Sequence, residues 1–143
     1  MNAKVFLDTN VLVYAAIGTG KDEFKRRRAL ELIDGEEFGT SAQVLQEFFV
    51  TVVKKATQPL TPAQALAWIE QFAVFACQPI DHQLVQIAIE QSQRHRISYW
   101  DAAILAAADS LGCHTLYSED LNDGQQFCRV RVINPFSSLA PLR

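Results

Sequence analysis

The sequence predicts an α/β fold in which a central parallel β-sheet is flanked by α-helices. Strand-like segments alternate with helix-like segments along the chain, which is the pattern of such sheets. The first strand, Val5 to Leu7, is a continuous apolar run, as expected for a strand buried on both faces. The length of 143 residues is about that of one domain. We therefore expect residues 1–143 to form a single domain.

Capping residues set the bounds of the expected helices. Asn10 can cap the first helix, and Thr40 and Gln43 have the spacing of a capping box. Thr61 is followed by Pro62, which combines a cap with proline at the first helical position. We expect helices over residues 10–17, 22–33, 40–55, 61–75, 81–94 and 98–112, and strands over residues 5–7, 37–40, 114–117 and 129–133.

The composition is that of a cytoplasmic protein. No apolar stretch is long enough to span a membrane, and the N-terminus does not resemble a signal peptide. The three cysteines are odd in number and lack the spacing of a metal site, which is typical of reduced thiols. The net charge of −3 argues against broad, non-specific binding to nucleic acids.

Two acids are expected at the carboxyl edge of the sheet. Asp8 directly follows the first strand, and Asp120 follows the strand that ends at Tyr117. Parallel sheets bind ligands at this edge, so a functional role for Asp8 is favoured over a helix cap, for which Asn10 is better placed. Asp120 shares its loop with Glu119 and Asp123, and acids in loops are usually turn formers.

Two further acids lie on expected helices. Glu47 falls on the flank of an apolar stripe, so by itself it is interpreted as a glutamate on the helix surface. Asp101 has capping-box spacing from Ser98, but it also shares a helix face with Ile104 and Leu105. A structural cap and an inward-facing acid are both compatible with this position.

Taken together, the acids indicate a metal site. Carboxylates that converge at a sheet edge repel one another unless a cation lies between them. Mg²⁺ prefers oxygen ligands and often binds through one or two carboxylates plus substrate phosphates. Such an ion can lower the pKa of a bound water that attacks phosphorus.

Four blocks of the sequence resemble the PIN-domain family, and within it the VapC-type toxin ribonucleases of toxin–antitoxin systems. The blocks are "FLDTNVLVY", "SAQVLQEF", "ISYWDAAILAAA" and "LYSEDL". They occur in the order of the family and cover nearly the whole chain. The resemblance implies a single PIN-like domain that is an Mg²⁺- or Mn²⁺-dependent endoribonuclease.

The resemblance also implies roles for individual residues. Asp8 and Asp101 would be the direct metal ligands, and Glu47 and Asp120 would complete the acidic quartet. Thr9 and Ser118 would contact the ligands and orient them without binding the metal themselves. Glu119 and Asp123 are neighbours that can substitute for the fourth acid.

Partners follow from the same resemblance. It implies a homodimer and a small antitoxin protein that covers the acidic site. For the RNA substrate, the basic run Lys25, Arg26, Arg27 and Arg28 is the first candidate contact, followed by Lys54 and Lys55. Trp100 can stack on a base, although a core aromatic is the favoured interpretation.

Two alternatives belong to other classes. One is a different Mg²⁺-dependent phosphohydrolase on a similar sheet, but Asn10 stands where the haloacid-dehalogenase signature places a second aspartate. The other is a non-catalytic module whose acids bind a metal or an arginine of a partner. Metal binding without phosphodiester cleavage would favour the second alternative.

Overall fold

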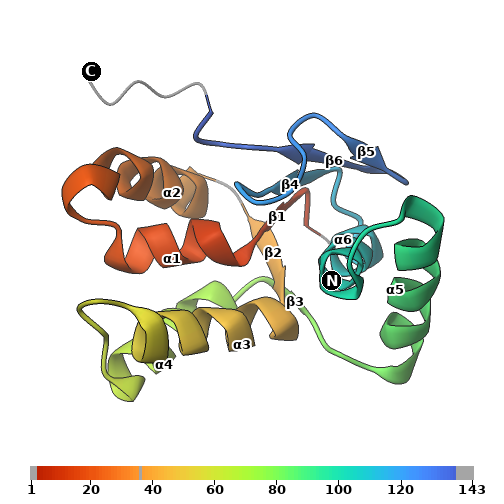
Figure 1. The fold of residues 1–143 in the computed structure, drawn as a ribbon. Helices are drawn as coiled ribbons and strands as arrows, with labels where there is room; N and C mark the ends of the chain where they lie inside the picture. Colours follow the sequence, from red (N-terminus) through yellow and green to blue (C-terminus); the bar gives the residue numbers. More distant parts are fainter. Residues whose placement is uncertain (1–2, 36, 138–143) are drawn as a thin grey trace.

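The computed structural model describes residues 3–35 and 37–137, and in this part six α-helices surround a six-stranded sheet (Figure 1). The strands are β1 (Val5–Leu7), β2 (Phe38–Ser41), β3 (Ala76–Gln78), β4 (Thr115–Tyr117), β5 (Gln126–Phe127) and β6 (Val130–Ile133). The helices are α1 (Thr9–Ile17), α2 (Glu23–Gly35), α3 (Ala42–Val50), α4 (Pro62–Phe72), α5 (His82–His95) and α6 (Tyr99–Ser110). A 3₁₀-helix, η1 (Gly20–Asp22), precedes α2, and a π-helix, η2 (Thr51–Lys55), continues α3.

The sheet confirms the predicted parallel α/β architecture. Its strand order is β3-β2-β1-β4-β6-β5, and every neighbouring pair is parallel except β5 and β6. Helices α1 to α4 lie on one side of the sheet, and α5 and α6 lie on the other (Figure 1). Both Phe6 and Leu7 are fully buried although successive strand residues face opposite sides, so β1 is covered on both faces as expected.

The pairing of β1 with β4 brings two chain segments to one edge. Leu7 is in register with Tyr117, and the backbone N–H of Asp8 donates to the Tyr117 carbonyl over 3.1 Å. Asp8 and Ser118 therefore leave neighbouring strands at the same carboxyl edge. This is the edge at which the sequence analysis places Asp8 and Asp120.

Two expected helix caps are wrong. Asp8, not Asn10, caps α1, because its extended backbone lets its carboxylate accept the Thr9 N–H over 2.7 Å. Likewise Ser41 caps α3 by accepting the Val44 N–H over 3.2 Å. Thr40 instead belongs to β2, where its side chain is buried.

Other start signals are confirmed. Thr61 and Gln64 form a reciprocal capping box at α4. Asp81 and Ser98 cap α5 and α6. The fourth helix ends at Phe72, earlier than expected, because residues 76–78 pair with β2 as an edge strand that the sequence did not indicate.

The strand β5 was also not predicted, since two residues are too few for a recognisable alternation. Within the described ranges, no helix is both long and apolar enough to cross a membrane.

Candidate active site

Asp8 is a buried acid at the centre of the carboxyl edge. Its side chain is 7% exposed, and its Oδ2 accepts the Ser118 hydroxyl over 2.7 Å. Burial raises the pKa of Asp8 to about 6, against the lowering effect of the hydrogen bonds from Ser118 and Thr9. The negative charges of Asp120 and Glu47 raise this pKa further. The pKa of Asp8 is therefore raised mainly by its burial, and the two neighbouring acids add to that effect.

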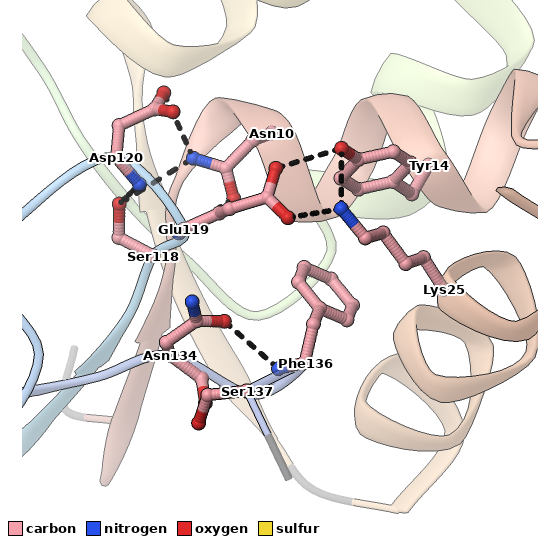
Figure 2. Close-up of polar contacts among 9 residues, drawn as sticks. All are labelled: Asn10, Tyr14, Lys25, Ser118, Glu119, Asp120, Asn134, Phe136 and Ser137. Atoms are coloured by element: carbon pink, nitrogen blue, oxygen red, sulfur yellow. Dashed lines mark hydrogen bonds and ion pairs between the residues drawn. The ribbon is translucent and has the colours of Figure 1, made fainter. Parts of the chain in front are cut away.

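Asn10 ties the turn after β4 to Asp8. Its amide nitrogen lies 3.2 Å from Oδ2 of Asp120, 3.4 Å from Oγ of Ser118 and 3.5 Å from Oδ2 of Asp8. Its side-chain carbonyl accepts the Glu119 N–H over 3.1 Å, so it binds the turn from both ends of the amide (Figure 2). The Ser118 hydroxyl oxygen also accepts the Asp120 N–H over 3.1 Å. Asp120 is therefore held beside Asp8 by neutral donors.

Glu47 reaches the same edge from α3. Its Oε1 accepts the Thr9 hydroxyl over 2.8 Å, and its Oε2 accepts the Gln43 amide over 3.2 Å. The interpretation of Glu47 as a surface residue, based on its position beside the apolar stripe, is wrong. The side chain is half-buried, because a glutamate on the flank of a stripe is long enough to turn toward the neighbouring helix α1.

Asp101 lies in the first turn of α6 and is half-buried. The Ser98 hydroxyl accepts its backbone N–H over 3.0 Å, so the helix start is capped by Ser98. The Gln43 amide that donates to Glu47 also donates to the Trp100 carbonyl over 3.2 Å, which links α6 to α3. In the described residues no hydrogen bond joins the Asp101 side chain to the other acids.

The donor set fits a hard divalent cation. Across residues 3–35 and 37–137, the groups that donate to Asp8, Glu47 and Asp120 are backbone amides, hydroxyls and carboxamides, all of them neutral. The acids are close enough to raise the pKa of Asp8, but within these ranges no three His, Cys, Asp or Glu side chains are grouped tightly enough to hold one ion. Mg²⁺ commonly keeps several waters and uses few protein ligands, which suits such a loose set of oxygens.

The other loop acids have different partners. Glu119 accepts the Tyr14 hydroxyl over 2.7 Å and forms an ion pair with Lys25 (Figure 2). Asp123 accepts the Asn134 N–H over 2.8 Å. Of the three acids in this loop, Asp120 is the one that shares a donor with Asp8.

The basic run does not form one face. Consecutive residues of a helix are about 100° apart, so Lys25 to Arg28 point in different directions around α2. Lys25 pairs with Glu119, and Arg26 and Arg28 form ion pairs with Glu23 and Glu31 on their own helix. Arg27 is exposed.

Three other side chains correct or extend the sequence analysis. Trp100 is 64% exposed beside Asp101, so the interpretation as a core aromatic is wrong. Gln43 and Asn10 were not expected among the residues that contact the acids. Gln43 stands four positions before Glu47, which places both on one helix face and is a signal that could have identified it.

The model of the PIN domain family matches residues 5–132. VapC20 of Mycobacterium tuberculosis, described as a sarcin-ricin loop cleaving toxin, is 22% identical, with a TM-score of 0.66 over 90% of this chain and 99% of that chain. A toxin–antitoxin complex from Klebsiella pneumoniae is 20% identical, with a TM-score of 0.66 over 92% and 98%.

VapBC2 from Rickettsia felis, bound to a DNA fragment from its promoter, is 16% identical, with a TM-score of 0.61 over 90% of this chain and 96% of that chain. No curated protein matches the sequence. At these identities the solved structures establish a shared fold. The family model covers most of the sequence, and the chain belongs to the PIN domain family.

Proposed function

We propose that this PIN domain is a divalent-metal-dependent endoribonuclease. The observation that carries the proposal is the convergence of Asp8, Glu47 and Asp120 at the carboxyl edge with only neutral hydrogen-bond donors around them in the described structure. A phosphatase of another fold is less compatible with the family membership. A binding module without turnover would need the same acids. The cleavage experiment below distinguishes it from a nuclease.

In this proposal Asp8 and Asp101 hold Mg²⁺ or Mn²⁺, and Glu47 and Asp120 complete the site. The bound ion supplies positive charge for the phosphodiester and lowers the pKa of a water ligand. Asp8 is fixed by Thr9 and Ser118, so its carboxylate does not need to reorganise when substrate binds.

RNA would be bound in part through exposed cations. Arg27 is exposed, and so are Lys54 and Lys55 at the end of η2. Exposed arginine and lysine contribute sequence-independent contacts to phosphates. Within the run Lys25 to Arg28, we propose Arg27 as the main RNA contact, because it is the exposed member. Lys25 already pairs with Glu119.

We further propose that the protein is the toxin of a toxin–antitoxin pair. Support comes from the solved structures of the same fold, whose descriptions name a toxin and toxin–antitoxin complexes. The proposed partners are a small antitoxin protein and a second copy of this chain. The reaction would take place in the cytoplasm.

The test is cleavage of a mixed RNA panel by the purified chain with Mg²⁺, with Mn²⁺ and with chelator. Asp101→Asn is compared with Asp109→Asn, which makes the same change on the same helix at a residue that pairs with Arg129 on the surface. We expect metal-dependent cleavage that Asp101→Asn loses and Asp109→Asn retains. Metal binding without cleavage by the wild-type chain would overturn the proposal in favour of a binding module.

A further inference from the structure

Glu119 and Asp120 are neighbours in one turn, yet their side chains point to different partners (Figure 2). Asp120 accepts the Asn10 amide, next to Asp8. Glu119 turns toward α1 and α2, where it meets the Tyr14 hydroxyl and the Lys25 ammonium. The same ammonium lies 3.2 Å from the Tyr14 hydroxyl oxygen, which closes a three-membered cluster.

The Lys25 ammonium is fixed in a partly enclosed position. It lies 4.9 Å from the ring centroid of Tyr14 and 5.7 Å from that of Phe136, within the range of cation–π attraction. The two rings pack edge to face at 5.2 Å. Burial acts to lower the pKa of Lys25, but Glu119 and Tyr14 outweigh it and the pKa is raised, so the ammonium stays charged.

This cluster is connected to the acids through a short piece of backbone. The Glu119 N–H donates to the side-chain carbonyl of Asn10. Ser118, on one side of Glu119, donates its hydroxyl to Asp8. Asp120, on the other side, accepts the Asn10 amide. Tyr14 and Lys25 hold the side chain of Glu119, and Asn10 holds its backbone. A shift of Glu119 would therefore move Ser118 and Asp120 with it.

We propose that Lys25 and Tyr14 are positioning residues, which hold Glu119 away from the acidic site and thereby fix the turn that presents Asp120 beside Asp8. The inference rests on the proposed metal-dependent nuclease site. It assigns Lys25 a role that differs from an RNA contact, and it explains why adjacent acids in one turn serve different purposes.

Two other roles for Lys25 make opposite predictions. If Lys25 acted only as a nearby positive charge, its removal would strengthen cation binding, because one repulsive charge would be lost. If it acted only as an RNA contact, its removal would raise KM and leave kcat unchanged. A positioning role predicts weaker metal binding and a lower kcat, with KM little changed.

The experiment measures Mn²⁺ affinity by titration calorimetry, and kcat and KM for RNA, with the full chain. We expect Lys25→Met to weaken Mn²⁺ binding and lower kcat by roughly tenfold, the low end of the loss seen when the partner of a metal ligand is removed. Lys25→Arg should restore most of both values. Tyr14→Phe removes only the hydroxyl and should give a smaller loss of the same kind.

Lys21→Met is the matched control, since it makes the same change at an exposed lysine of η1. It should leave Mn²⁺ affinity unchanged. If Lys25 acts through Glu119, its substitution should have little further effect in the Glu119→Gln background, so the two changes should not be additive.

Mn²⁺ binding by a folded Lys25→Met variant that equals or exceeds the wild-type affinity would overturn the inference. If that variant does not fold, wild-type affinity and kcat in Tyr14→Phe would overturn it. A wild-type chain that binds Mn²⁺ but cuts no RNA would refute the proposed function, and the affinities would still test the positioning role. A wild-type chain that binds no Mn²⁺ would refute both the proposed function and the positioning role.

Discussion

The acids of the candidate site lie on two sides that are built differently. On the strand side, Asp8 and Asp120 follow the paired strands β1 and β4 and share Asn10 as a donor. On the helix side, Glu47 and Asp101 lie on α3 and α6, which Gln43 connects through one amide. Asp8 is buried, whereas Asp101 is half-buried.

This difference indicates where the electrostatic strain of the site is concentrated. Sheet register and the side chains of Asn10 and Ser118 fix the strand side before any ion binds, so the unfavourable burial of charge falls on Asp8. The helix side depends on fewer contacts and carries less burial. Substitutions on the two sides should therefore have the same consequence for cleavage but different consequences for stability.

The largest expected effect is on cleavage. Asp8→Asn and Asp101→Asn should each reduce the RNA cleavage rate by more than about 100-fold, since loss of a metal ligand exceeds the 10- to 100-fold typical of its supporting residues. Initial rates with saturating Mg²⁺ measure this. Near-wild-type cleavage by Asp101→Asn alone would show that Asp101 is not part of the site.

The next effect is on stability as a function of pH. The pKa of Asp8 is raised in the folded protein from 3.8 to about 6, so the folded state binds this proton more readily than the unfolded state. In metal-free protein the free energy of unfolding should therefore fall as pH rises from about 4 to about 6, and stay lower above that. At about 1.4 kcal/mol per pH unit, the difference between these pKa values corresponds to about 3 kcal/mol.

Urea denaturation with chelator between pH 4 and pH 8 measures this contribution. Asp8→Asn should lack it and be more stable than wild type at pH 7, whereas Asp101→Asn should retain it. Equal pH profiles for wild type and Asp8→Asn would contradict the contrast between the two sides.

Ser118→Ala tests the strand side with a smaller expected effect on stability. The variant loses the hydrogen bond to the buried Asp8 carboxylate, which should lower the free energy of unfolding by about 2 kcal/mol at pH 7. Ser110→Ala is the control, because its hydroxyl is exposed and bonds Gln78 away from the acids; it should change stability by less than about 0.5 kcal/mol. Equal losses in chemical denaturation would show that Asp8 does not depend on Ser118.

Gln43→Leu tests the helix side and should have the smallest effect on stability. It removes the amide between Glu47 and the Trp100 carbonyl and should reduce the free energy of unfolding by about 1 kcal/mol. The pH profile set by Asp8 should be unchanged, while cleavage should fall. Gln46→Leu, at an exposed position of α3, serves as the comparison. A changed pH profile in Gln43→Leu would mean that the two sides are coupled.

Much of the fold could be predicted from local sequence. The apolar run of β1 and the capping box at Thr61 are signals contained in a few adjacent residues, and the structure confirms both. Aspartate and asparagine are both good caps, and the sequence alone favours Asn10 as the better placed of the two. Sheet pairing decides between them, since it fixes where β1 ends and therefore where the helix can begin.

The site was less accessible to sequence reasoning because its contacts join distant segments. Local periodicity described Glu47 as a flank residue, and only the packing of α3 beside α1 brings it to Thr9. Glu119 and Asp120 are indistinguishable as loop acids, and their partners lie more than 90 positions away, at Lys25 and Asn10. The sequence therefore indicated the acids but not which of them face one another.

The exposure of Trp100 has an optical consequence. The chain has two tryptophans, and the other, Trp68, is half-buried and packed on Phe72 with ring centroids 5.6 Å apart. Trp100 is 64% exposed and directly precedes Asp101. Emission at longer wavelengths and accessibility to aqueous quenchers therefore belong mainly to Trp100, which makes the protein its own fluorescent reporter for whatever covers the start of α6.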